Sequence, residues 1–181
     1  GGSYNNQIGD FFYNNVIYNE FYDNFIENEF SFNTIVSDFT NNKIGNGFAG
    51  NYLIRYGFNN NNILNGFSSN KLSSTYFERN QIGNNFNYNL IYSNFRDNQI
   101  GYDFENNTID GGTVNNVFGN VVQYNIIESD FYHNQIANQF KGNVFYDDFG
   151  LNVVDSYIGG NNFSGYTTGN RIEIGRAHVW T

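Results

Sequence analysis

A nine-residue repeat runs through nearly the whole chain and restricts the folds that the chain can adopt. The unit is Asn-x-Ile-x-x-x-Phe-x-x, in which the residue two after the asparagine is always apolar and the residue six after it is Phe in most units. Sixteen of the 18 intervals between successive asparagines are nine residues, and two are ten. The asparagines are Asn6, Asn15, Asn24, Asn33, Asn42, Asn51, Asn61, Asn70, Asn80, Asn89, Asn98, Asn107, Asn116, Asn125, Asn134, Asn143, Asn152, Asn161 and Asn170. Apolar residues spaced alternately four and five apart drift around an α-helix instead of forming one stripe, so the repeat excludes a helical fold.

The spacing fits a β-solenoid, in which short strands alternate with bends and each coil pairs with the coils above and below it. One Ile-type and one Phe-type side chain of each unit then point inward, and the asparagine lies on the same inner side. A buried carboxamide is unfavourable unless it is hydrogen-bonded. Equivalent asparagines stacked about 4.8 Å apart can bond to one another or to the adjoining bends, so we expect them to form a ladder.

A weaker second period predicts two units per coil. When the units are numbered from Asn6, glycine follows the Ile position only in odd units and tyrosine only in even units. These residues are Gly9, Gly45, Gly83, Gly101 and Gly119, and Tyr18, Tyr92 and Tyr146. Both ten-residue units are even, so their extra residues would fall at the same corner of successive coils. In the first of them, either Leu53 or Ile54 can occupy the inward position.

We therefore expect an all-β, single-stranded parallel β-solenoid (β-helix) of about 18 residues per coil. It would have about 9–10 coils and a length of roughly 45 Å, with its handedness left open. A coil of three units and about 27 residues is the alternative, and it would scatter the odd and even features over three faces.

Composition supports a folded rod and excludes several other classes. The chain of 181 residues has 38 Asn, 20 Phe and 15 Tyr and lacks Pro, Cys and Met, and its 39% apolar content is too high for a disordered polar tract. Without cysteine there is no disulfide framework and no thiolate metal site. A net charge of −9 argues against binding nucleic-acid phosphates. No apolar run is long enough for a membrane span, and no signal-peptide pattern is visible, so we expect no membrane insertion.

Carboxylates recur immediately before the Phe position and form the main candidate for chemistry. They are Glu20, Glu29, Asp38, Asp103, Asp130 and Asp148. If stacked about 5 Å apart, they could collect a cation or act as a glycosidase pair, but we favour a solvated face that keeps the rod soluble. The aspartate spacing of calcium-binding nonapeptide repeats is missing.

Other candidates carry less chemistry. His133 has no triad partners in its sequence neighbourhood, so we expect it on the surface. Two glycine pairs, at 111–112 and 159–160, fit bends that need positive φ and lack the lysine of a phosphate loop. Tyr13, Tyr18, Tyr22, Tyr92, Tyr102 and Tyr146 could form an aromatic platform for sugars or a protein, or could merely cover the sheet. We therefore assign no catalytic, cofactor-binding or metal-binding residue and expect no cofactor.

The last residues differ from the repeat. The segment from Glu173 to Thr181 resembles a translated sequencing adapter in which the stop codon TGA is decoded as tryptophan. We expect residues 174–181 to be a non-native tail and residues 1–173 to be an uncapped fragment of a β-solenoid repeat domain. Uncapped ends would template further strands, so we expect end-to-end association.

The motif Asn-Gln-Ile-Gly-x-x-Phe, at Asn6–Phe12, Asn80–Phe86 and Asn98–Phe104, resembles the arrays of phage tail-fibre-like and uncharacterised bacterial repeat proteins. The chain is also distantly similar to pentapeptide-repeat proteins, although their coil is 20 residues and their inward small residue is rarely asparagine. The tail-fibre resemblance implies a structural or receptor-facing shaft, often trimeric, without catalysis in this segment.

Our first hypothesis is accordingly a non-enzymatic structural or adhesion module of a phage tail fibre or bacterial surface protein, located on the virion or the cell surface. Its expected partners are further copies of the chain, as a trimer or end to end, and a surface glycan or protein receptor. One alternative is an acidic rod that mimics duplex DNA and inhibits a DNA-handling enzyme. Another is a β-helix that binds or cleaves polysaccharide.

Overall fold

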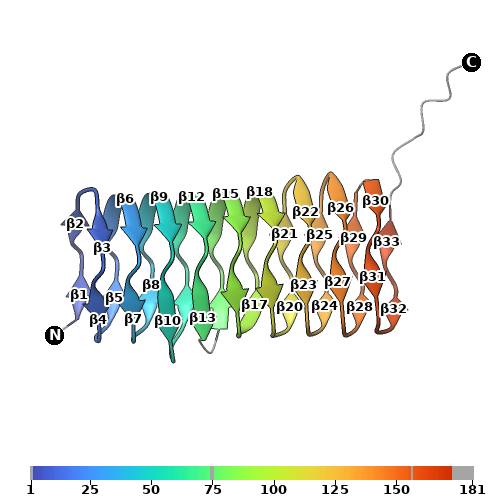
Figure 1. The fold of residues 1–181 in the computed structure, drawn as a ribbon, viewed down its shortest axis with the longest axis horizontal. Helices are drawn as coiled ribbons and strands as arrows, with labels where there is room; N and C mark the ends of the chain where they lie inside the picture. Colours follow the sequence, from blue (N-terminus) through green and yellow to red (C-terminus); the bar gives the residue numbers. More distant parts are fainter. Residues whose placement is uncertain (1, 74–75, 156, 173–181) are drawn as a thin grey trace, which may run out of the picture.

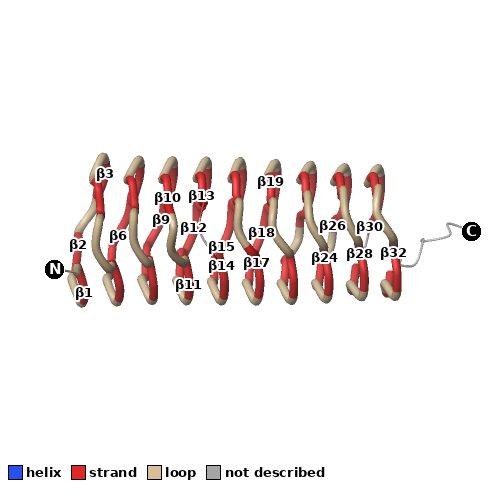
Figure 2. Tube along the Cα trace, turned by 90° about the horizontal axis from the view of Figure 1, so that it is seen from below, coloured by secondary structure: helices blue, strands red, loops and turns tan. Residues whose placement is uncertain are grey.

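The computed structural model describes residues 2–73, 76–155 and 157–172, and every regular element within these ranges is a β-strand. The strands form three parallel sheets that run the length of a straight rod of stacked coils (Figures 1 and 2). The fold is the predicted parallel β-solenoid, with about nine turns. The predicted tail at 174–181 lies outside the described residues.

Sheet A contains β1 (Ser3–Tyr4), β5 (Phe21–Tyr22), β8 (Phe39–Thr40), β11 (Phe58–Asn59), β14 (Tyr76–Glu78), β17 (Asn94–Arg96), β20 (Thr113–Val114), β24 (Phe131–Tyr132), β28 (Phe149–Gly150) and β32 (Thr167–Thr168). Sheet C contains β4 (Val16–Ile17), β7 (Thr34–Ile35), β10 (Tyr52–Ile54), β13 (Lys71–Ser73), β16 (Leu90–Ile91), β19 (Thr108–Ile109), β23 (Ile126–Ile127), β27 (Val144–Phe145) and β31 (Asn162–Phe163).

Sheet B contains β2 (Gln7–Ile8), β3 (Phe12–Tyr13), β6 (Phe25–Ser31), β9 (Lys43–Ala49), β12 (Asn62–Ser68), β15 (Gln81–Asn87), β18 (Gln99–Glu105), β21 (Val117–Phe118), β22 (Val121–Gln123), β25 (Gln135–Ile136), β26 (Gln139–Lys141), β29 (Val153–Val154), β30 (Tyr157–Gly159) and β33 (Arg171–Ile172). Odd units thus supply sheet B, whereas each even unit supplies one strand of sheet C and one of sheet A.

Strand register confirms two units per coil. Ile26 pairs with Ile44, and Phe30 pairs with Phe48, each 18 residues later. A coil of 27 residues is therefore wrong. Where a ten-residue unit intervenes, the partner is 19 residues away, and Leu53 pairs with Leu72. Leu53 is buried whereas Ile54 is half-buried, so Leu53 fills the inward position.

Every residue that precedes a ladder asparagine has a left-handed backbone conformation, with φ between 53° and 64°. These residues lie at two of the three bends of each coil, the bend from sheet B to sheet C and the bend from sheet A to sheet B. Most of them are not glycine, and they include Phe32, Tyr88 and Leu151. A non-glycine residue in the left-handed conformation lowers the stability of the fold by about 1–2 kcal/mol, so interactions around the corner must offset this strain.

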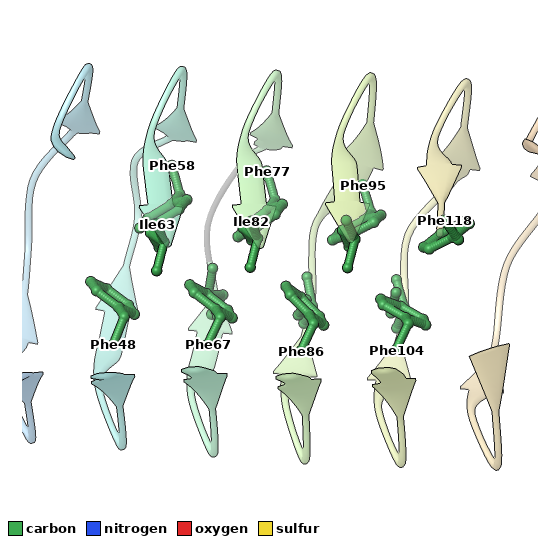
Figure 3. Packing of buried hydrophobic residues seen from close by; sticks show 14 of the residues in the cluster. Phe48, Phe58, Ile63, Phe67, Phe77, Ile82, Phe86, Phe95, Phe104 and Phe118 are labelled. Carbon is green, nitrogen blue, oxygen red and sulfur yellow. The ribbon is translucent and has the colours of Figure 1, made fainter. Parts of the chain in front are cut away.

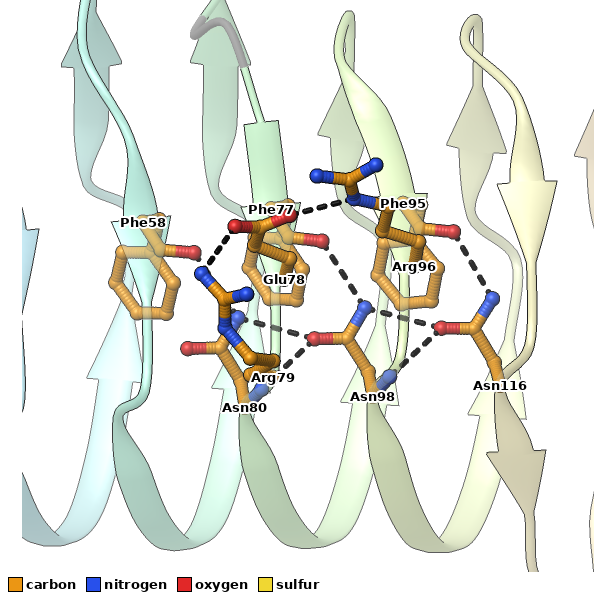
Figure 4. Close-up of polar contacts among 9 residues, drawn as sticks. All are labelled: Phe58, Phe77, Glu78, Arg79, Asn80, Phe95, Arg96, Asn98 and Asn116. Carbon is orange, nitrogen blue, oxygen red and sulfur yellow. Dashed lines mark hydrogen bonds and ion pairs between the residues drawn. The ribbon is translucent and has the colours of Figure 1, made fainter.

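That compensation comes from the asparagine that follows each corner. Asn98 is fully buried, and its Nδ2 donates to Asn116 Oδ1 and to the Phe77 carbonyl oxygen, both at 3.0 Å (Figure 4). Its Oδ1 accepts hydrogen bonds from both the backbone N–H and the Nδ2 of Asn80, again at 3.0 Å. All four hydrogen-bonding positions of the carboxamide are thus occupied. The same pattern recurs along the rod in two ladders, one from odd and one from even units, as predicted.

Phenylalanine rings fill the core between the sheets. Within a column the rings stack, as for Phe48 and Phe67, whose centroids are 5.0 Å apart. Rings of neighbouring columns meet edge to face, as for Phe58 and Phe67, with centroids 5.6 Å apart (Figure 3). Both geometries suit the ring quadrupole. These rings and the Ile columns form one continuous core.

One exchange within the core explains an irregularity of the repeat. Thr113 takes a Phe position, and five residues later Phe118 takes an Ile position. The Phe118 ring lies nearly parallel to both Phe95 and Phe131, at 6.4 and 6.0 Å, and so continues the stack that Thr113 interrupts. The volume lost at one inward position is regained at another.

Two local features differ from the repeat pattern. In β6, β9, β12, β15 and β18 the two short strands of an odd unit run together into seven-residue strands. Of the glycine pairs expected to need positive φ, only Gly160 has it, so that expectation is wrong for the others. At Gly111 a Cβ would lie 2.2 Å from the Ser93 carbonyl oxygen, so close packing of adjacent coils, and not φ, requires glycine there.

Candidate functional site

The predicted acidic column is divided between two faces of the rod. Glu29 and Asp103 belong to β6 and β18 of sheet B, four coils apart. The other four carboxylates precede strands of sheet A, where Glu20 neighbours Asp38 and Asp130 neighbours Asp148. The expectation of a single stacked column is therefore wrong. Because odd and even units occupy opposite positions in the coil, the same place in the unit faces two directions.

The first pair, Glu20 and Asp38, separates two hollows of about 350 Å³ each. The first hollow is lined by Gly2, Tyr18, Asn19, Glu20, Val36, Ser37, Asp38 and Tyr56. The second hollow is lined by Glu20, Tyr22, Asp38, Thr40, Asn41, Asn59 and Tyr76. Each hollow therefore combines two tyrosines with the same two carboxylates.

Backbone contacts hold Asp38 in place. Its Oδ1 accepts a hydrogen bond from the backbone N–H of Gly57 at 2.9 Å. Ser37 lines the first hollow, is only 6% exposed and donates weakly to the Asp38 carbonyl oxygen at 3.4 Å, which leaves its own oxygen able to accept. Glu20 is exposed, so its carboxylate is open to a ligand.

The two ten-residue units supply one tyrosine to each hollow. Their extra residues lie at the same corner of successive coils, as predicted, because Leu53 and Phe58 pair with Leu72 and Phe77 on either side. Tyr56 comes from this corner of the first such unit and lines the first hollow. Tyr76 comes from the second and lines the second hollow. Tyr18 and Tyr22 are among the candidates predicted from the sequence, whereas Tyr56 and Tyr76 are not, although the insertions that position them are visible in the sequence.

The second carboxylate pair has a related arrangement. Asp148 Oδ1 accepts from the backbone N–H of Tyr166 at 3.0 Å, and its Oδ2 accepts from the Tyr132 hydroxyl at 3.3 Å. The pKa of Tyr132 is raised, first by burial and then by the negative charge of Asp148, with smaller effects from Asp130 and Asp147. This side of the rod therefore carries a second acidic site.

A buried ion group lies between the two carboxylate pairs along sheet A. Glu78 is 4% exposed and accepts hydrogen bonds from Arg79 and from Arg96 Nε, the latter at 2.5 Å (Figure 4). The hydrogen bond and charge of Glu78 raise the pKa of Arg96. The two guanidinium groups neutralise a carboxylate that would otherwise be isolated in the wall, so we interpret this group as structural.

Sheet B carries a different surface feature. A groove of about 430 Å³ crosses four coils, and its lining includes Gly83, Gly101, Gly119, Gln81 and Gln99. A Cβ at Gly119 would lie 1.7 Å from the Gly101 carbonyl oxygen, so glycine lets adjacent coils approach here. None of the residues that line this groove carries a charge.

The remaining sequence candidates are dispersed. His133 is exposed at a left-handed corner, as expected for a surface residue. Of the six tyrosines singled out, Tyr22 stacks on Tyr4 at 5.3 Å, and the described residues include no ring contact between any two of the six. The six tyrosines therefore do not form a single aromatic platform, and of the six only Tyr18 and Tyr22 line the two hollows.

The described part of the chain contains no group of three or more His, Cys, Asp or Glu side chains that could hold a metal ion. Among the same residues, no helix has the length and apolar character needed to cross a membrane. The hollows thus offer hydrogen-bond acceptors and aromatic faces as their chemistry. Comparison with known proteins found no matching family model, no matching curated protein and no matching solved structure.

Proposed function

We propose that this chain is a non-enzymatic, rod-shaped spacer and adhesion module of a phage tail fibre or a bacterial surface protein, exposed on the virion or the cell surface. The observation that carries the proposal is the pair of saturated asparagine ladders that pass from coil to coil. They fix the wall of the rod, whereas the irregular features lie on its outside. A long shaft with local surface variation suits presentation of a binding site away from its anchor.

The repeat motif adds to this proposal through its resemblance to phage tail-fibre-like arrays. The alternative of a DNA mimic receives less support. Such a rod would need carboxylates in continuous lines along its surface. In the line that contains Asp38 and Asp130, the four intervening coils carry uncharged residues at the same position, namely Gly57, Tyr76, Asn94 and Gly112.

The proposal is tested by adhesion and hydrolysis measured on the same protein. We expect the fluorescently labelled 181-residue chain to bind intact cells of a bacterial panel and to release no reducing ends from their purified surface polysaccharides. Release of reducing ends that is abolished by Glu20→Gln would show a polysaccharide-cleaving enzyme and overturn the proposal. Absence of binding to every cell type would remove the adhesive part of it.

A further inference from the structure

We propose that the two hollows beside Glu20 and Asp38 form one binding site for a neutral oligosaccharide of at least two sugar rings. This inference rests on the adhesive function proposed above and gives it a place and a ligand class. The two hollows share both carboxylates, so a ligand that fills them both must pass over Glu20 and Asp38.

The chemistry of the walls matches a sugar. Tyr18 and Tyr56 stand in the first hollow with 72% and 51% of their surfaces exposed, and Tyr22 and Tyr76 line the second. A pyranose presents apolar C–H faces that pack on aromatic rings, and its hydroxyl groups donate to carboxylates in strong charge-assisted bonds. The carboxylates and the net charge of −9 repel anionic saccharides, so anionic saccharides are excluded from the proposed ligands.

Several wall residues are held before a ligand arrives. Asp38 is fixed by the Gly57 N–H, and the Tyr76 ring packs so closely over Gly57 that a Cβ there would lie 2.0 Å from the ring. Tyr22 is stacked on Tyr4. Side chains ordered in advance lose less entropy on binding, so the site is suited to a weakly binding, hydroxyl-rich ligand.

The position of the insertions provides an independent argument. The repeat departs from its nine-residue interval only twice in the chain, and both departures place a tyrosine in a wall of these hollows. Arg55, in the first insertion, has a φ of 84°, outside the narrow range of the regular corners. Local irregularity and backbone strain of this kind collect at functional sites.

The test is binding of the purified chain to an array of neutral hexose and N-acetylhexosamine oligosaccharides of two to six rings, with sialylated and sulfated forms of the same chains. Calorimetric titration then gives the affinity of each neutral chain that binds. We expect neutral chains to bind and their anionic forms not to bind. Tyr18→Ala, Glu20→Gln and Asp38→Asn should each weaken binding by roughly tenfold or more, since hydrogen bonds to charged groups and aromatic contacts are of that strength.

The variants are chosen so that folding is retained. Asp38→Asn keeps an Oδ1 acceptor for the Gly57 N–H, and Tyr18 and Glu20 are exposed. Tyr102→Ala and Glu128→Gln make the same changes at exposed positions outside both hollows and should leave the affinity unchanged. Thermal unfolding of each variant verifies that the rod is intact.

Three results would overturn the inference. The first is a lack of binding to every oligosaccharide, and the second is an equal loss of affinity in the control variants. The third is binding of Ca²⁺ alone that Glu20→Gln abolishes, which would make Glu20 and Asp38 a cation site. If cells are still bound in any of these cases, the adhesive function stands and only the assigned site fails. Release of sugar, in contrast, would overturn the proposed function itself.

Discussion

At the residue scale, hydrogen-bond counting explains why asparagine alone occupies the inner corner. Each coil presents a carboxamide with two acceptors, the next asparagine Oδ1 and a Phe carbonyl oxygen, and with two donors from the preceding asparagine. Aspartate would lose both donors, serine lacks the second donor, and glutamine is longer by one methylene. Any other side chain leaves buried polar groups without partners, each at a cost of about 1–3 kcal/mol.

Replacing one ladder asparagine by aspartate should therefore give a pH-dependent loss of stability. In Asn98→Asp the new carboxyl would face Asn116 Oδ1 and the Phe77 carbonyl oxygen, both acceptors, so burial and these neighbours raise its pKa. The folded state then holds a proton that the unfolded state releases above about pH 4. We expect the free energy of unfolding, measured by urea titration, to fall relative to wild type by about 1.4 kcal/mol per pH unit above that point.

Asn94→Asp adds the same charge at an exposed position and is the matched control. It should follow the wild-type profile across this pH range. An Asn98→Asp variant whose stability deficit is the same at pH 4 and pH 7 would show that the carboxamide is not held among acceptors as described.

At the scale of elements, the strands and inward columns could be predicted because the asparagine recurs in every unit and most units repeat the same apolar inner residues. The outer surface could not be predicted in the same way. Glu29 and Glu20 occupy the same place in the unit, yet one lies in a continuous strand of sheet B and the other at the edge of the hollows. The consensus unit is the same for both, and the position of the unit within the coil sets the direction in which its outer residues face.

The exchange between Thr113 and Phe118 shows a coupling between elements that the repeat does not encode. Thr113→Phe would place a second ring in the stack that Phe118 already continues, and overpacking of this kind costs about 1–3 kcal/mol. Phe118→Ile alone leaves a gap and should also destabilise, by about 1–3 kcal/mol. The double variant restores the consensus unit at both positions.

Urea unfolding of the two single variants and the double variant measures this coupling. We expect the double variant to recover most of the lost stability, with a coupling energy of about 0.5–3 kcal/mol. Additive losses would mean that the two side chains fill separate spaces. Leu72→Val, a smaller change in a regular part of the core, supplies the comparison and should not be rescued by Thr113→Phe.

At the scale of the whole molecule, each coil contacts only the coils before and after it, so stability is a sum of local terms. A coil can then vary on its outer side without affecting distant coils. This is why the hollows could form around two insertions while the ladders on the inside stay unbroken. The insertions could be predicted from the sequence but the hollows could not, because the contribution of Tyr56 and Tyr76 to the same hollows as Glu20 and Asp38 depends on the stacking of four coils.

Nearest-neighbour stability also predicts that one coil can be removed. Deletion of residues 107–124 joins Asn106 to Asn125, so a left-handed corner residue again precedes a ladder asparagine, and it removes Thr113 and Phe118 together. Phe95 would then stack directly on Phe131. We expect cooperative unfolding with stability close to wild type, and X-ray scattering should show a rod about 4.8 Å shorter. Deletion of residues 107–126 removes only two residues more but puts Ile127 at the ladder position, so it should abolish the cooperative unfolding transition. If both deletion variants unfold alike, the asparagines do not set the register of the coils along the rod.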